Sequence, residues 1–209
     1  MSNFLKFAGI ILGIWVVIGI IFLVSQQSTK QGSQNDSPVV AIVNGVELTR
    51  EEYNGRLAQS ESKDSEQIVS QMVSEELVLQ EAQKQNFVAS DEAIQARYDQ
   101  LKTNFESDEE FQQALVAEGL TEDQLKKNIS EQIIIQQYID KITQENPIEI
   151  SDEEINAYYE SSIEGTEEPP KLEEVYDQIR DQIKNTKQSE VIQGVVSNLS
   201  DQADIQILL

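Results

Sequence analysis

The segment Val39-Val-Ala-Ile-Val-Asn-Gly-Val-Glu-Leu-Thr-Arg-Glu-Glu52 sets the beginning of the folded domain. Its first five residues are β-branched apart from one alanine, which favours a short strand, and the Asn-Gly pair supplies the positive φ angles of a tight turn. Thr49 lies three residues before Glu52, the spacing at which a hydroxyl and a carboxylate together cap a helix. The segment predicts a strand, a turn and a helix that begins near Arg50.

Four further helix starts follow from the same kind of pattern. A hydroxyl residue precedes a pair or run of acidic residues at Ser90, Ser107, Thr121 and Ser151. The hydroxyl caps a free backbone N–H group, and the acids of the first turn complement the helix dipole. We expect a helix to begin directly after each of these residues.

Two longer segments carry broad apolar faces at helical spacing. Residues 64–86 form one such face and are expected to be the central core helix. Residues 122–143 form a wider face, which implies contact with more than one neighbouring element. Gly119 is expected to end the helix before the second segment, and Asn146-Pro147 to end that segment's own helix.

The C-terminal part of the chain has three further elements. A helix is expected over residues 151–160, after the extended residues 148–150, and a longer one from residue 171 to about residue 199. Residues 203–208 alternate between apolar and polar side chains, as a strand does.

The first 24 residues differ in composition from the rest of the chain. Residues 7–24 are uncharged and apolar, and as a helix they would span about 27 Å, close to the ~30 Å hydrocarbon core of a bilayer. A cleaved signal peptide is the alternative, but its apolar core is shorter, about 7 to 15 residues, and a small-residue cleavage site follows it. We expect residues 1–24 to be an uncleaved membrane anchor and the Ser/Gln-rich residues 25–38 to be a flexible linker.

The positive charges beside the apolar run indicate its orientation. Lys6 and the amino terminus lie on one side, and only Lys30 lies on the other. Because basic residues favour the cytoplasmic side, we expect a cytoplasmic N-terminus and an extracytoplasmic domain over residues 39–209.

The composition excludes several classes of chemistry. The chain has no histidine and no cysteine, which removes imidazole and thiolate catalysis and the commonest ligands of zinc, copper and haem. We therefore expect no catalytic, metal or cofactor site, and we interpret the acidic runs as solvated helix ends. With 15 Lys and Arg against 38 Asp and Glu, the net charge is −23, so nucleic acid and anionic lipid headgroups are poor partners. The acidic surface serves either solubility or the attraction of basic clients.

The order of these elements resembles that of the SurA/PrsA family of extracytoplasmic chaperones and foldases. The resemblance rests on the opening strand, the Asn-Gly turn and the Thr-capped helix, and on the helix after Ser151, the long helix from Lys171 and the terminal strand. In such proteins the helix corresponding to residues 151–160 leads into an inserted parvulin prolyl isomerase domain, whose active site relies on histidines. Residues 161–170 are the only space for such an insertion here, whereas a compact domain needs on the order of a hundred residues. The chain thus resembles the chaperone portion without the isomerase.

The expected fold is all-α, with one N-terminal transmembrane helix and a small two-stranded sheet that joins residues 39–43 to residues 205–208. The resemblance implies a membrane-anchored holdase chaperone that binds unfolded or newly secreted polypeptides and has no prolyl isomerase activity. The alternative is a cell-envelope scaffold that binds one dedicated folded partner. The sequence does not set an oligomeric state.

The resemblance also implies an apolar groove for unfolded polypeptide. We select its candidate residues because aromatic and large aliphatic side chains offer adaptable apolar contact, and the alternative for each is ordinary core packing. The candidate client-binding residues are Phe105, Phe111, Leu115, Tyr138, Tyr158 and Tyr159.

Overall fold

The structure is a computed structural model that describes residues 38–60, 64–164 and 169–209. In chain order its elements are β1 (Val39–Val43), β2 (Val46–Thr49), α2 (Arg50–Gln59), α3 (Ser65–Lys84), α4 (Asp91–Lys102), α5 (Asp108–Ala117), α6 (Glu122–Glu145), α7 (Asp152–Ile163), α8 (Leu172–Gln202) and β3 (Ile205–Ile207). The prediction of a mostly helical domain is confirmed.

The membrane anchor predicted over residues 1–24 lies outside the described residues, as does nearly all of the predicted linker, residues 25–38. Across the three described ranges, no helix combines the length and the apolar character that a membrane crossing requires.

The opening segment folds as predicted except for one added strand. Asn44 and Gly45 have φ angles of 52° and 87°, and they form a two-residue turn that places Val46 directly opposite Val43. Residues 46–49 therefore pair with β1 as β2 before the helix begins. The sheet has three strands in the order β2-β1-β3, so the prediction of two strands was wrong.

Thr49 is both the last residue of β2 and the cap of α2. Its hydroxyl accepts a hydrogen bond from the Glu52 backbone N–H at 3.2 Å, and the Glu52 carboxylate accepts one from the Thr49 backbone N–H at 3.1 Å. The predicted capping box and the predicted helix start are confirmed. The same residue thus ends the sheet and orients the first helix.

The predicted pairing between the first and last strands is also confirmed. Val43 lies opposite Ile205 and Ala41 lies opposite Ile207 in an antiparallel pair. The Leu208 backbone N–H extends the pairing by donating to the Val40 carbonyl at 2.8 Å. The two ends of the domain therefore meet in one sheet.

The helix boundaries follow the predicted signals. A side-chain oxygen of Ser90, Ser107, Thr121 and Ser151 accepts a hydrogen bond from the first turn of α4, α5, α6 and α7, respectively. Gly119, with a φ angle of 70°, follows α5, and Asn146 caps the end of α6. The single helix predicted from residue 171 onward is α8.

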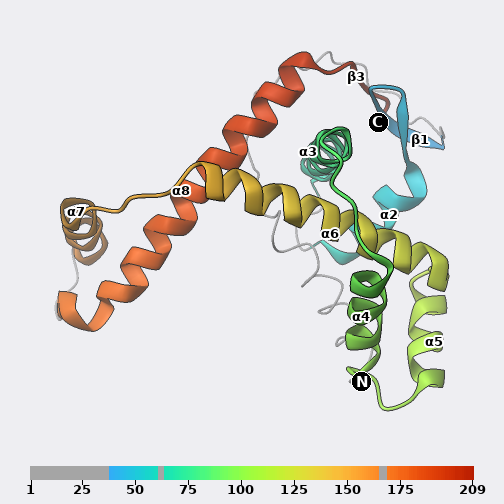
Figure 1. The fold of residues 1–209 in the computed structure, drawn as a ribbon, viewed down its shortest axis with the longest axis horizontal. Coiled ribbons are helices and arrows are strands. Elements are labelled where there is room, and N and C mark those ends of the chain that lie inside the picture. The colour runs from blue at the N-terminus through green and yellow to red at the C-terminus, as the bar shows by residue number, and fades with distance from the viewer. Residues whose placement is uncertain (1–37, 61–63, 165–168) are drawn as a thin grey trace.

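Most of the helices pack around α3 and α6, whereas α7 packs on α8 (Figure 1). Helix α3 contacts α2, β1, α6 and α8, and α6 also contacts α4 and α8. Figure 1 shows α7 beside the first turns of α8 at one end of the molecule, and the sheet with α2 near the other end. The predictions of a central α3 helix and of several neighbours for α6 are confirmed.

The core is divided into four apolar clusters rather than one. The sheet cluster joins β1, β2, α2 and α3, and the central cluster joins α3, α6 and α8. The α4–α5 cluster also includes the first half of α6, and the α7–α8 cluster contains Ile155, Ile179 and Ile183. The α7–α8 arm is thus held together by a small core of its own.

Candidate polypeptide-binding surface

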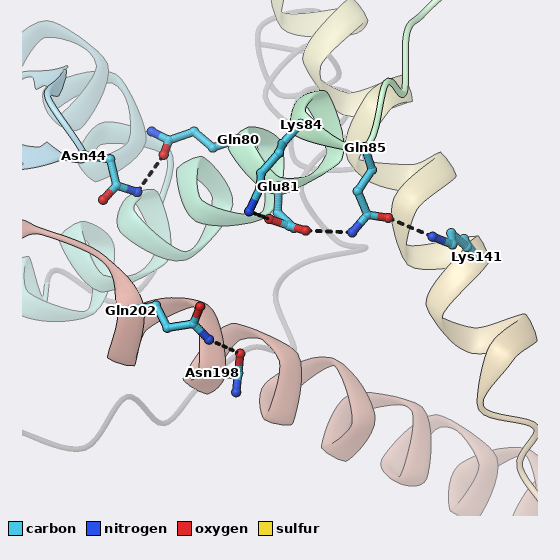
Figure 2. Close-up of polar contacts among 8 residues, drawn as sticks. All are labelled: Asn44, Gln80, Glu81, Lys84, Gln85, Lys141, Asn198 and Gln202. Carbon is cyan, nitrogen blue, oxygen red and sulfur yellow. Dashed lines mark hydrogen bonds and ion pairs between the residues drawn. The ribbon is translucent and has the colours of Figure 1, made fainter.

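Asn44 connects three elements around the sheet. Its amide Nδ2 donates to Gln80 Oε1 on α3 at 2.8 Å, a contact drawn in Figure 2. Its Oδ1 accepts from the Asp204 backbone N–H at 2.9 Å, and its own backbone N–H donates to the Asp204 carbonyl at 2.8 Å. Gln80 also donates to the Val43 carbonyl at 3.1 Å. The hairpin turn, α3 and the start of β3 are therefore held together by polar contacts at one point.

Among the residues that the structure describes, none pairs with the outer edge of β3. Residues opposite each other in an antiparallel pair alternate between hydrogen-bonded and non-bonded positions. Because Leu208 bonds Val40 and Asp204 bonds Asn44, the bonded positions of this segment are 204, 206 and 208. The N–H and C=O groups of Ile205 and Ile207 consequently point away from β1, and no strand of the described part of the chain lies beyond them.

The sheet also exposes an apolar side chain on each of its two outer strands, Ile207 on β3 and Val46 on β2. Ile207 is 58% exposed and Val46 is 43% exposed, whereas Ala41 and Val43 in the central strand are fully buried. Since Val46 faces Val43 and Ile207 faces Ala41, all four side chains lie on one face of the sheet. We define the β3 edge surface as the outward backbone of Ile205 and Ile207 together with the Ile207 side chain. It combines unpaired hydrogen-bonding groups with apolar area.

Three of the sequence-predicted client-binding residues lie in the core. Phe111 and Leu115 are buried in the α4–α5 cluster, and Tyr138 is buried in the central cluster. Phe105 is half-buried and packs edge-on against Phe111, with ring centroids 5.3 Å apart. These four residues pack as core or against it, and a client could not reach the buried three in this conformation.

The other two candidates lie on the α7–α8 arm. Tyr158 is 39% exposed. Among the large apolar side chains that are exposed in the described part of the chain, it is the one aromatic side chain. Tyr159 packs on the α7–α8 cluster, and its hydroxyl donates to the Pro170 carbonyl at 2.7 Å. The structure therefore separates the six candidates into three groups, in the α4–α5 cluster, the central cluster and the α7–α8 arm, and does not bring them into one site.

Sequence reasoning missed the aromatic neighbours that complete these clusters. Tyr98 packs edge-on against Phe111 at 5.5 Å, and Phe87 packs edge-on against Tyr138 at 5.8 Å. Burial, together with a hydrogen bond to Glu122, raises the pKa of Tyr98 to about 12. Tyr98 lies within the helix that Ser90 caps. Its position on that helix was the signal in the sequence that could have indicated its burial.

A charged cluster lies between α2, α3 and α6. Glu75 on α3 is buried and forms an ion pair with Arg56 on α2 at 2.5 Å. Burial raises the pKa of Glu75 above its ordinary value, and the neighbouring Arg56 opposes that rise. Burial also raises the pKa values of Glu76 and Glu131, and the charge of Glu131 adds to the rise at the other two carboxyls. This cluster fixes α2 against α3, and no bound group is needed to account for it.

A second polar network joins the ends of α3 and α6, as Figure 2 shows. Lys141 donates to Gln85 Oε1 at 2.7 Å, and Gln85 Nε2 donates to Glu81 Oε1 at 2.7 Å. This bond from Gln85 is the main reason why the pKa of Glu81 lies below its ordinary value. Lys84 lies 3.4 Å from Glu81, within the same helix. The chain of contacts ties α3 to α6 through side chains that are mostly exposed.

The polar contacts offer structural support rather than chemistry. In the described ranges, no group of three or more acidic residues is arranged to hold a metal ion. The whole chain lacks histidine and cysteine. We take the β3 edge surface as the candidate binding surface because it combines outward backbone groups with an exposed apolar side chain, and the sequence had indicated its strand but not such a role.

Comparisons with known proteins place these features in a family. The family described as "SurA-like N-terminal domain" matches residues 1–139. The chain is similar to "Foldase protein PrsA" of Clostridium botulinum (strain Okra / Type B1), with 25% identity over 131 residues that cover 60% of this chain and 38% of the relative. It is also similar to "Foldase protein PrsA" of Clostridium kluyveri (strain ATCC 8527 / DSM 555 / NBRC 12016 / NCIMB 10680 / K1), with 32% identity over 116 residues that cover 51% of this chain and 34% of the relative.

The chain thus spans little more than a third of the length of these relatives. The family match is broader with respect to this chain, because it covers well over half of the residues and reaches into α6. On this match, the chain belongs to the SurA-like N-terminal domain family.

Proposed function

We propose that this protein is a membrane-anchored, extracytoplasmic holdase chaperone that binds unfolded or newly secreted polypeptides without prolyl isomerase activity. The observation that carries the proposal is the match of residues 1–139 to the SurA-like N-terminal domain. The relatives carry the name foldase, and a domain without imidazole or thiol groups can assist folding by binding chains rather than by covalent chemistry.

The short connection between α7 and α8 supports a role without isomerase activity. Helix α7 ends at Ile163 and α8 begins at Leu172. A compact domain of about a hundred residues cannot be placed within that connection.

The proposed organisation assigns one role to each part of the chain. Residues 1–24 anchor the protein, residues 25–38 tether it, and residues 39–209 form the chaperone domain on the outer side of the membrane. The uncharged run of residues 7–24 supports the anchor, since it has the length of a bilayer crossing. The tether would hold the domain near polypeptides that emerge at the membrane surface.

The client-binding area that we propose includes exposed or half-buried apolar groups. Tyr158, Tyr159 and Phe105 remain candidates from the sequence, and Ile207 joins them because of its exposure. Phe111, Leu115 and Tyr138 would contribute only through a conformation in which their clusters open.

Suppression of client aggregation tests the proposal. The full chain is placed in lipid nanodiscs, and light scattering is followed from two unrelated, chemically unfolded clients at increasing chaperone concentration. Empty nanodiscs and an equally acidic inert protein serve as controls. We expect suppression beyond both controls for both clients, whereas no suppression would favour a scaffold with one dedicated folded partner.

Isomerase activity has a separate test. We expect the full chain to leave the rate of a proline-limited refolding step unchanged, because that step is intrinsically slow and requires a catalytic site to accelerate it. A rate that increases in proportion to the chaperone concentration would contradict this part of the proposal.

A further inference from the structure

We infer that the β3 edge surface binds an extended, basic and apolar segment of a client polypeptide as a fourth strand of the sheet. This inference rests on the proposed chaperone function and names the contact through which it acts. The occupant would extend the sheet beyond β3, giving the order β2-β1-β3-client.

The backbone geometry supports an added strand. The N–H and C=O groups of Ile205 and Ile207 are the outward positions of β3, because Leu208, Gln206 and Asp204 occupy the bonded positions toward β1. A strand edge with unpaired groups is a template for another chain. Two outward residues offer up to four backbone hydrogen bonds to an extended segment.

The edge strand is short, at three residues, but it lacks the side-chain and bulge features that also protect free strands. Lysine, proline and bulges commonly blunt exposed edges, and β3 contains none of them. The bulge of the sheet lies instead on the opposite side, between β1 and β2 near Val39. Ile207 adds an apolar side chain that is 58% exposed beside the free backbone groups.

Charge indicates the chemistry of the occupant. The strands and turn over residues 39–49 and the segment 188–209 contain no lysine or arginine, whereas Asp201 and Asp204 are exposed directly before β3. A basic client segment would approach an acidic edge, and the net charge of −23 would attract it over a longer range. The same charge opposes pairing of β3 with β3 of a second copy of this chain, because both partners would carry it.

A peptide probe tests this contact on the full chain in nanodiscs. The probe is a ten-residue, end-capped peptide that alternates valine and lysine, and its counterpart alternates valine and glutamate. The Ile207→Pro variant removes an outward N–H group and leaves the bonds of Gln206 and Leu208 toward β1 intact. The Ile207→Val variant is the matched control, because it keeps both the N–H group and an apolar side chain.

We expect Ile207→Pro to weaken binding of the lysine peptide at least tenfold and Ile207→Val to change it less than twofold. The glutamate peptide should bind more weakly than the lysine peptide. Circular dichroism and thermal unfolding verify that both variants fold. Equal affinity of Ile207→Pro and the wild-type chain for the lysine peptide would overturn the inference.

Amide hydrogen exchange of the wild-type chain gives a second readout that does not depend on any variant. We expect the lysine peptide to slow exchange at Ile205 and Ile207, the amides that point outward. No slowing at saturating peptide would overturn the inference. Exchange at these amides could instead slow as the protein concentration rises in the absence of peptide. If sedimentation then also shows dimers, the edge binds a second copy of the chain, and this result would likewise overturn the inference.

The two proposals fail in different ways. If the wild-type chain and Ile207→Pro suppress client aggregation equally and the amides stay unprotected, the edge inference fails and the chaperone function stands. If the wild-type chain suppresses no aggregation, the chaperone function fails, whatever the peptide result.

Discussion

At the scale of single residues, Asn44 combines an unusual backbone conformation with several polar contacts. It adopts a positive φ angle of 52° and also bonds Gln80 and both backbone groups of Asp204. Glycine would supply the backbone angle but none of the side-chain bonds, and alanine would supply neither. Asn44 is therefore a position where conformation and side-chain bonding can be separated experimentally.

We predict that Asn44→Gly lowers the free energy of unfolding by about 1–2 kcal/mol, because two side-chain hydrogen bonds are lost at ~1 kcal/mol each. Asn44→Ala should cost about 1 kcal/mol more, since a Cβ atom strains the left-handed conformation. Urea unfolding of the full chain in nanodiscs, followed by circular dichroism, measures both. Equal stability of the two variants would contradict the role assigned to the φ angle.

The carboxyls between α2, α3 and α6 predict a pH dependence. Burial raises the pKa values of Glu75, Glu76 and Glu131 above 4.5 in the folded state, so the folded protein binds these protons more tightly than the unfolded chain does. Their contribution to stability is therefore present below pH 4.5 and is lost as the pH rises through the raised values. Urea titrations at pH 4.5 and pH 7 measure it.

Glu131→Gln isolates one part of this effect. The variant removes one half-buried charge and its repulsion of Glu75, although it also removes the 3.5 Å ion pair with Lys127. We expect Glu131→Gln to be more stable than the wild-type chain at pH 7 and to lose that advantage near pH 4.5. Lys127→Gln is the control for the lost ion pair. An advantage of Glu131→Gln that is the same at both pH values would contradict the assignment.

The sequence predicted the helix N-caps more reliably than it predicted contacts between side chains of different helices. Thr49, Ser90, Ser107, Thr121 and Ser151 were predicted correctly because a cap depends on neighbours within three residues. The surroundings of Phe111 and Tyr138 depend on residues from other helices. Periodicity shows that such a side chain lies on the apolar face of its helix. It does not show whether a neighbouring helix covers that face.

At the scale of elements, β2 shows where local patterns were insufficient. The Asn-Gly turn was recognised, but the four residues after it are too few for alternation to distinguish a strand from a loop. Their pairing with β1 follows from the two-residue turn, which places them beside β1. By contrast, α3, α6 and α8 were predicted with nearly correct bounds because their apolar faces extend over many turns.

Deletion of residues 203–209 tests the connection between the two ends of the domain. The deletion removes β3 and exposes the edge of β1. In the intact chain this edge is hydrogen-bonded to residues 204, 206 and 208. It also removes Ala203, Ile205 and Leu209 from the sheet cluster. We expect the deletion to lower the thermal midpoint and the cooperativity of unfolding, and an unchanged transition would contradict this role of β3.

At the scale of the whole molecule, the four separate apolar clusters and the acidic surface set the type of binding to expect. Helix α8 runs from the α7–α8 arm to the sheet, so the elements are spread along its length (Figure 1). A net charge of −23 attracts basic chains before contact and repels acidic ones. Binding should therefore begin with electrostatic attraction and be completed by apolar and backbone contacts.

This account predicts a salt effect. Raising the ionic strength from about 0.01 M to about 0.15 M shortens the Debye length from ~30 Å to ~8 Å. We expect the association rate with a basic unfolded client to fall at least tenfold, while the dissociation rate changes less. Stopped-flow fluorescence measures both rates. An association rate that does not depend on salt would show that the acidic surface serves solubility alone.

The most direct test compares two states of one basic client protein. The native protein is compared with the same protein after its disulfides are reduced and its cysteines blocked with a neutral reagent, so that it cannot refold. Fluorescence anisotropy gives the affinity of the full chain in nanodiscs for each state. The account predicts binding of the unfolded state and at least tenfold weaker binding of the native state. Equal binding of both states, or binding of the native state alone, would contradict a holdase.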